Sequence, residues 1–106
     1  MSGVTFTIAA FASTSDAIKI DEDRALTAIR FPSAMTGTAV DVHGSIDGVT
    51  YSPIYNEGVK LTVAFVASSW HQIAPAKTFG FRWFKVVSNG TEASAASIIG
   101  KATRVL

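Results

Sequence analysis

Apolar and polar residues alternate on both sides of the dipeptide Asp47-Gly48. Before it, apolar side chains and Gly44 occupy the even positions of residues 40–46; after it, apolar side chains occupy the odd positions of 49–53. Period-two alternation is typical of strands with one buried face. A tight two-residue turn needs positive φ, which Gly adopts freely and Asp tolerates better than most residues. The pattern therefore predicts two antiparallel strands joined by a tight turn at Asp47-Gly48. Pro53 lacks an N–H donor, so the second strand should end there or lie at a sheet edge.

Further alternating segments recur along the chain and are separated by turn signals. The other predicted strands cover residues 4–10, 17–20, 25–31, 60–66, 79–88 and 98–106. Seven or eight short strands without a sustained helical period are typical of an antiparallel β-sandwich or jelly roll. We expect one all-β domain over residues 1–106, with no helix longer than a turn or two. Residues 1–11 could form an extended arm.

The more apolar face of each strand is expected to form the core. Residues 79–88 carry bulky side chains on both faces, so this strand should be central and covered on both sides for part of its length. Residues 74–77 predict a turn. The expected core residues are Phe6, Ile8, Val40, Val42, Leu61, Val63, Phe65, Phe81, Trp83 and Val87.

Charge and cysteine content argue against several classes of protein. The net charge is +1 and the basic residues are scattered, which argues against binding of nucleic acid or an anionic membrane. The chain has no cysteine, so disulfides and thiolate metal sites are excluded. No apolar run approaches the roughly 20 residues of a membrane span, and we see no export signal. Only 16 % of the residues are charged, against a usual share of about 25 %. This share suggests burial in an assembly, or else a well-packed sandwich with a Ser, Thr and Gly surface.

No pattern in the sequence predicts catalysis. His43 lies two residues after Asp41 on the same strand face, but two ligands do not make a zinc site, and a hydrogen-bonded strand histidine is the simpler interpretation. The acidic cluster at 21–23 does not have the spacing of a calcium loop and predicts a solvated turn. Nucleophile-elbow and phosphate-loop motifs are absent. We therefore predict that the protein is not an enzyme and has no cofactor or metal.

The segment 45–58 also carries a family resemblance. It contains Ser45, Asp47, Gly48, Tyr51, Ile54, Tyr55 and Gly58 in a spacing that resembles small β-sandwich virion proteins of tailed bacteriophages. The similarity continues through Pro75, Phe79, residues 81–88 and the terminal Arg104-Val105-Leu106, so it covers residue 31 to the end.

The resemblance implies a capsid decoration or cement protein that stabilises the head shell by bridging neighbouring subunits. It implies a location in the virion, after assembly in the host cytoplasm. The implied partners are the major capsid protein or another virion protein, together with further copies of the chain. A tail or neck component is a variant of the same prediction.

A glycan-binding module for host adhesion is the alternative. Its platform for sugar rings would be aromatic, with polar side chains nearby to bind hydroxyl groups. These aromatics could instead belong to the core or flank the hairpin, which is the more common role of aromatic residues in strands. The proposed platform is Tyr51, Tyr55, Trp70 and Trp83, with Asp41, Asp47, Asn56 and Arg82 around it. The candidate partner-binding residues overall are Asp47, Gly48, Tyr51, Tyr55 and Trp70.

Overall fold

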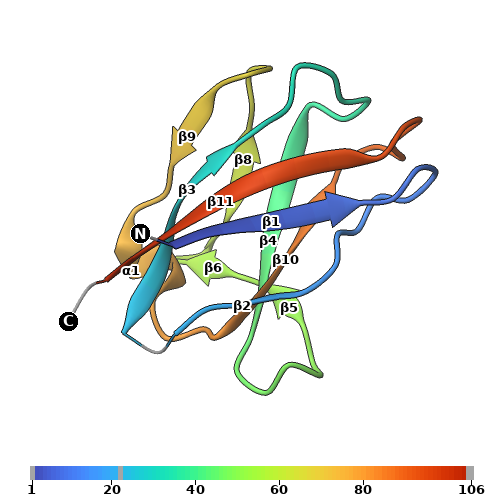
Figure 1. Cartoon of the computed structure of the whole chain (residues 1–106). Helices are drawn as coiled ribbons and strands as arrows, with labels where there is room; N and C mark the ends of the chain where they lie inside the picture. Colours follow the sequence, from blue (N-terminus) through green and yellow to red (C-terminus); the bar gives the residue numbers. More distant parts are fainter. Residues whose placement is uncertain (1, 22, 105–106) are drawn as a thin grey trace.

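The protein is an antiparallel β-sandwich, as the alternation predicts (Figure 1). The computed structural model describes residues 2–21 and 23–104. The first sheet has the order β1-β11-β3-β9, with bounds Ser2–Ile8, Ala96–Arg104, Arg24–Arg30 and Trp70–Gln72. The second has the order β2-β10-β4-β5, with bounds Ile18–Lys19, Trp83–Ser88, Ala39–Ser45 and Ser52–Pro53.

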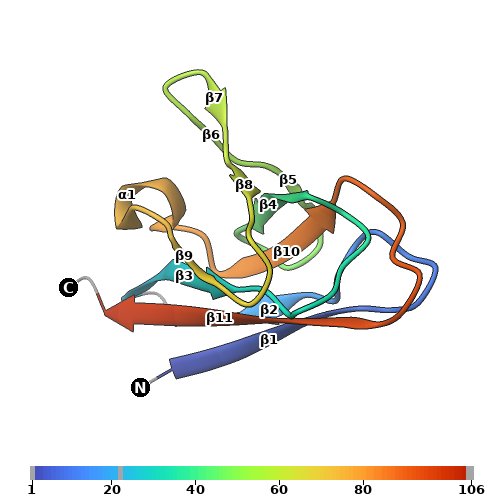
Figure 2. The ribbon, with the colours of Figure 1, turned by 90° about the horizontal axis from the view of Figure 1, so that it is seen from above.

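Three further elements complete the domain. Strand β8 (Thr62–Ala64) also pairs with β4. Strands β6 (Tyr55–Asn56) and β7 (Val59–Lys60) form a separate two-stranded ribbon, which projects from the sandwich in Figure 2. The helix α1 (Pro75–Thr78) is a single turn, within the limit predicted for helices.

The core lies between the two sheets. Five of the expected core residues are buried: Phe6, Ile8, Val40, Val42 and Leu61. Three more, Val63, Phe65 and Phe81, are partly buried and pack against the core. The core also includes residues that were not among those expected, chiefly Leu26, Ile29, Phe31, Phe84, Val86 and Ile98.

The prediction for Trp83 and Val87 is wrong, because the faces of β10 are reversed. Phe84 and Val86 are fully buried, whereas Trp83 and Val87 lie on the outward face and are only half-buried. The outward-facing side chain of Trp83 is covered by the loop between β4 and β5. A Cβ atom at Gly48 would lie 2.7 Å from Cε2 of the indole, so the β4–β5 loop lies directly against the ring.

The hairpin between β4 and β5 exists, but its turn is longer than two residues. His43 pairs with Pro53 and Gly44 with Ser52, so residues 46–51 form a loop. Gly48 has the expected positive φ, 76°. The strand that contains Pro53 lies at the sheet edge, as its missing N–H predicts.

The predicted strand at 79–88 begins late, and the turn predicted before it is helical. Pro75 suits the first turn of a helix, where its missing N–H costs nothing. The hydroxyl of Thr78 donates to the carbonyl oxygen of Leu26 at 2.8 Å and fixes α1 against β3. Gly80 then reverses the chain with φ of 102°, and β10 starts only at Trp83.

The first strand is part of the sheet. Ser2–Ile8 pair with β11, from Ser2 opposite Ala102 to Ile8 opposite Ala96, and do not extend away as an arm. Residues 105 and 106 of the resemblance, residue 22 of the acidic cluster and residue 1 lie outside the described residues.

Candidate functional site

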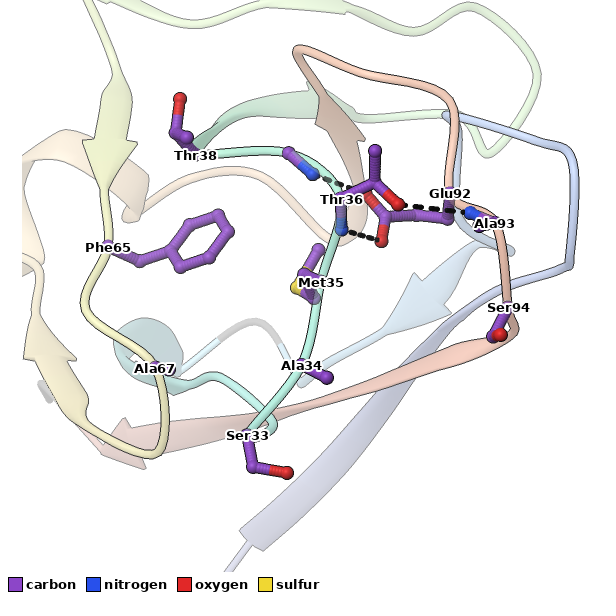
Figure 3. Close-up of a pocket in the computed structure, with 11 residues that line it drawn as sticks. Ser33, Ala34, Met35, Thr36, Thr38, Phe65, Ala67, Glu92, Ala93 and Ser94 are labelled. Atoms are coloured by element: carbon purple, nitrogen blue, oxygen red, sulfur yellow. Dashed lines mark hydrogen bonds between the residues drawn. The ribbon is translucent and has the colours of Figure 1, made fainter.

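Loops at one end of the sandwich line an open pocket of about 450 Å³ (Figure 3). This volume is within the roughly 300–1,000 Å³ that is typical of small-molecule sites. The walls come from the β3–β4, β8–β9 and β10–β11 connections, which are far apart in sequence. The lining residues are Ser33, Ala34, Met35, Thr36, Gly37, Thr38, Phe65, Ala67, Glu92, Ala93 and Ser94.

The carboxylate of Glu92 holds this end of the molecule together. Its Oε1 accepts the N–H of Thr36 at 2.8 Å, and its Oε2 accepts the N–H of Gly37 at 2.9 Å and the Ser88 hydroxyl at 3.1 Å. The side chain is 1 % exposed, and these bonds replace the water that burial removes. The backbone of Glu92 also exchanges bonds with Phe11 and Ala12 in the β1–β2 loop. One residue therefore connects three loops.

A second set of contacts fixes the β3–β4 loop to the start of the β10–β11 loop. The side-chain oxygen of Asn89 accepts the N–H of Thr38 at 2.9 Å, and its amide donates to the Thr38 hydroxyl at 2.9 Å. Gly37 passes so close that an added Cβ would overlap the Ser88 hydroxyl. Glycine is therefore required where the loop crosses Glu92.

The pocket has an apolar wall and a polar rim. Phe65 stacks on Phe31 with ring centroids 4.1 Å apart and points toward Met35 in Figure 3. Hydroxyl groups on the rim come from Ser33, Thr36, Thr38 and Ser94. Those of Thr36 and Thr38 already accept bonds, from the Ala93 N–H at 3.1 Å and the Asn89 amide at 2.9 Å. Among the lining residues Glu92 alone is ionisable, and its oxygens are already occupied. The arrangement suits an uncharged ligand that has both an apolar face and hydrogen-bonding groups.

The sequence did not identify this pocket. Residues 33–38 and 89–94 predict only loops, because their side chains follow no motif. Thr36 and Glu92 are 56 positions apart and meet only through the fold. The polar composition of these two loops is the one feature of the sequence that could have indicated a binding site there.

The predicted aromatic platform is divided among different sheets. Tyr51 is in the β4–β5 loop and Tyr55 is on the projecting β6–β7 ribbon. Trp70 lies on β9 at the edge of the four-stranded sheet, whereas Trp83 belongs to the five-stranded sheet. Two lysines lie over these rings: Lys85 Nζ is 4.4 Å from the Tyr51 centroid, and Lys19 Nζ is 5.4 Å from that of Trp83.

Asp47, another predicted binding residue, organises its own loop. Its Oδ1 accepts the N–H of Thr50 at 3.0 Å, the N–H of Val49 at 2.8 Å and the hydroxyl of Ser45 at 2.8 Å. The bonds from Thr50, Val49 and Ser45 lower the pKa of Asp47 from 3.8 to about 2. Together with Gly48 against Trp83, they give the β4–β5 loop one defined shape.

Asp41 and His43 are neighbours on the outward face of β4. Burial alone would raise the pKa of Asp41, but the hydrogen bonds from Thr62 and Lys60 and the charge of Lys60 outweigh it and lower the pKa. Burial lowers the pKa of His43, and Lys60 and Lys85 lower it further against the opposing charge of Asp41. Asp41 is thus already bound, through Lys60 Nζ at 3.2 Å and Thr62 Oγ1 at 2.6 Å.

In the described part of the chain, no three His, Cys, Asp or Glu side chains lie close enough to hold a metal ion. The same residues contain no helix that is long and apolar enough to cross a membrane.

Comparison with known proteins gives a fold similarity. No family model matches the sequence, and no curated protein matches it. Among solved structures, the chain is similar to CBM32-1, a carbohydrate-binding module from a family 31 glycoside hydrolase of Clostridium perfringens. The TM-score is 0.54 and the identity 14 %, over 91 % of this chain and 74 % of that one. At this identity the likeness shows the fold alone, and the resemblance to virion proteins stays a prediction.

Proposed function

We propose that this domain binds carbohydrate and does not catalyse a reaction on it. The pocket at the loop end is the observation that carries the proposal. Sugars present apolar C–H faces beside hydroxyl groups, and the pocket offers the Phe65 and Met35 side chains beside a rim of hydroxyls. Aromatic surface together with a few placed polar groups is the usual composition of such sites.

Charge in the pocket favours an uncharged sugar. Glu92 is the one ionisable residue of the lining, and its carboxylate accepts bonds from Thr36, Gly37 and Ser88. Hydrolysis of a glycosidic bond usually needs two carboxyl groups that flank the bond. The lining offers one, which is buried and already bonded. Binding without cleavage is therefore the function that this chemistry supports.

The fold similarity to a solved structure also supports the proposal. CBM32-1 of the Clostridium perfringens enzyme is named as a carbohydrate-binding module, and the two sandwiches share their architecture. The glycan-binding alternative from the sequence and the present proposal name the same kind of ligand but different sites. The sequence pointed to an aromatic platform, whose Trp70 and Trp83 lie in different sheets, whereas the proposed site is the pocket at the loop end.

Calorimetric titration of the intact chain with neutral mono- and disaccharides tests the proposal. Two exposed alanines of the β10–β11 loop give matched variants: Ala93 lines the pocket and Ala95 does not. Ala93→Trp should fill the pocket and weaken binding at least tenfold, while Ala95→Trp should bind like the parent. The proposal is wrong if no sugar binds the parent at millimolar concentration, or if both variants keep its affinity.

The virion location stays a separate prediction. A glycan-binding module displayed on a particle could attach it to a host, so the two predictions are compatible. Adding the purified protein to particles that lack it, and counting the bound copies, tests the location. Hundreds of copies would support a decoration protein, and absence of binding would leave the carbohydrate proposal alone.

A further inference from the structure

Strand β1 leaves one edge of the four-stranded sheet unpaired. It lies at the end of the order β1-β11-β3-β9, and among the described residues no strand pairs with its other edge. Thr7 shows which backbone groups face outward, because its N–H donates to the Asp16 carboxylate at 2.8 Å and its carbonyl accepts the Asp16 N–H at 3.1 Å. Backbone groups of a strand alternate in direction, so those of Gly3 and Thr5 face the same free edge.

Apart from the Asp16 contact at Thr7, this edge has no feature that usually prevents strand pairing. Exposed edges are normally made short, or charged, or interrupted by proline or a bulge. Strand β1 has seven residues, Ser-Gly-Val-Thr-Phe-Thr-Ile, without a charge or a proline. Its pairing with β11 runs without a register shift. The opposite edge strand, β9, has only three residues.

We propose that the free edge of β1 pairs antiparallel with β1 of a second copy of this chain, and so joins the two four-stranded sheets. The pairing is centred on Val4. Gly3 of each copy then lies opposite Thr5 of the other, and both residues have outward N–H and C=O groups. Each of these two pairs exchanges two backbone hydrogen bonds, as in any antiparallel ladder. A two-fold interface of this kind is self-complementary.

Two observations favour a second copy as the occupant, and a third limits the length of the contact. The strand itself is uncharged, and the pocket beside Val4 is lined by charges of both signs, Lys19, Asp21 and Arg24, so self-pairing does not bring a cluster of one sign together. Val4 is only half-buried although it lies on the core face with Phe6 and Ile8, and the second Val4 would cover it. Asp16 occupies the edge at Thr7, so the shared pairing is limited to the segment around Val4. Such a short contact belongs with small, reversible interfaces.

Single-cysteine variants test both the contact and its register. The chain has no cysteine, so each variant has one thiol. Val4 would face Val4 of the second copy as a non-hydrogen-bonded pair, with Cα atoms about 4.5 Å apart, a distance that a disulfide can span. Thr5 would face Gly3, so two Thr5 positions would be too far apart. Mild oxidation should therefore link Val4→Cys into a dimer and leave Thr5→Cys monomeric.

Proline variants test the hydrogen bonds themselves. A Cβ atom added at Gly3 would meet no heavy atom within 4 Å, and the N–H of Gly3 points to the free edge, so Gly3→Pro should leave the sandwich intact while removing one edge donor. In analytical ultracentrifugation the parent should approach twice its 11.2 kDa mass as concentration rises. Gly3→Pro and Thr5→Pro should remain monomeric, and Thr5→Val, which keeps its N–H, should dimerise. A parent that is monomeric at millimolar concentration, or faster linkage of Thr5→Cys than of Val4→Cys, would overturn the proposal.

Discussion

Two carboxylates, Asp47 and Glu92, show how single residues shape the loops of this domain. Asp47 binds backbone N–H groups within three positions of itself, and Glu92 binds groups 55 and 56 positions away. The sequence predicts a turn at Asp47 because its contacts are local. It gives no indication of the role of Glu92, because every side-chain contact to the β3–β4 loop depends on tertiary structure.

Because of Asp47, the stability of the folded domain should depend on pH in the acid range. Its folded pKa of about 2 is below its ordinary 3.8, so between these values the unfolded chain binds more protons. Stability from this group is therefore present above about pH 4 and is lost as pH falls toward 2. Asp47→Asn keeps an oxygen acceptor but does not titrate there. Thermal melts from pH 5 to 2 should show a steeper loss for the parent, and parallel curves would exclude the effect.

Removal of Glu92 should destabilise the loop end. In Glu92→Ala the N–H of Gly37 loses its acceptor in a buried site, and the N–H of Thr36 loses its acceptor in a partly buried one. The expected cost is about 2–4 kcal/mol of unfolding free energy. Ser94→Ala, an exposed change in the same loop, should stay within about 0.5 kcal/mol of the parent. Urea denaturation measures both, and equal midpoints would show that the Glu92 contacts add nothing.

At the scale of elements, the alternation predicts strands well and their faces less well. The strands at Ser2–Ile8, Arg24–Arg30 and Ala39–Ser45 lie close to their predicted positions. The strand predicted at 60–66 is instead divided into β7 and β8. Strand β10 is the exception in its faces, because Trp83 and Phe84 offer bulk on both and local sequence does not show which face meets the core. The β4–β5 loop covers Trp83 from outside, and that contact could not be predicted from the strand itself.

A pair of adjacent valines tests the observed orientation of β10. Val86 is fully buried, while its neighbour Val87 lies on the outward face. Val86→Ala should cost about 2–3 kcal/mol through lost burial and the cavity left behind. Val87→Ala should cost less than about 1 kcal/mol. Denaturant melts that gave the larger loss at Val87 would mean that the strand faces the other way.

For the whole molecule, the sequence predicted the fold class and not the site. An all-β sandwich follows from local alternation and turn residues, both of which are written along the chain. The pocket follows from three loops that meet at one end of the sandwich, and from the Glu92 hydrogen bonds that hold them. Within the predicted platform, Trp70 and Trp83 belong to different sheets, whereas the β4–β5 loop that carries Tyr51 lies against Trp83.

Amide chemical shifts during a sugar titration test carbohydrate binding at the loop-end pocket residue by residue. With the best neutral sugar from the calorimetric panel, the largest shift changes should fall on Thr36, Gly37, Ala93 and Ser94, which line the pocket. Amides near Trp83 and Tyr51 on the other surface should move little. Shifts concentrated around Trp83 and Tyr51, or no saturable shift with any neutral sugar, would contradict the account.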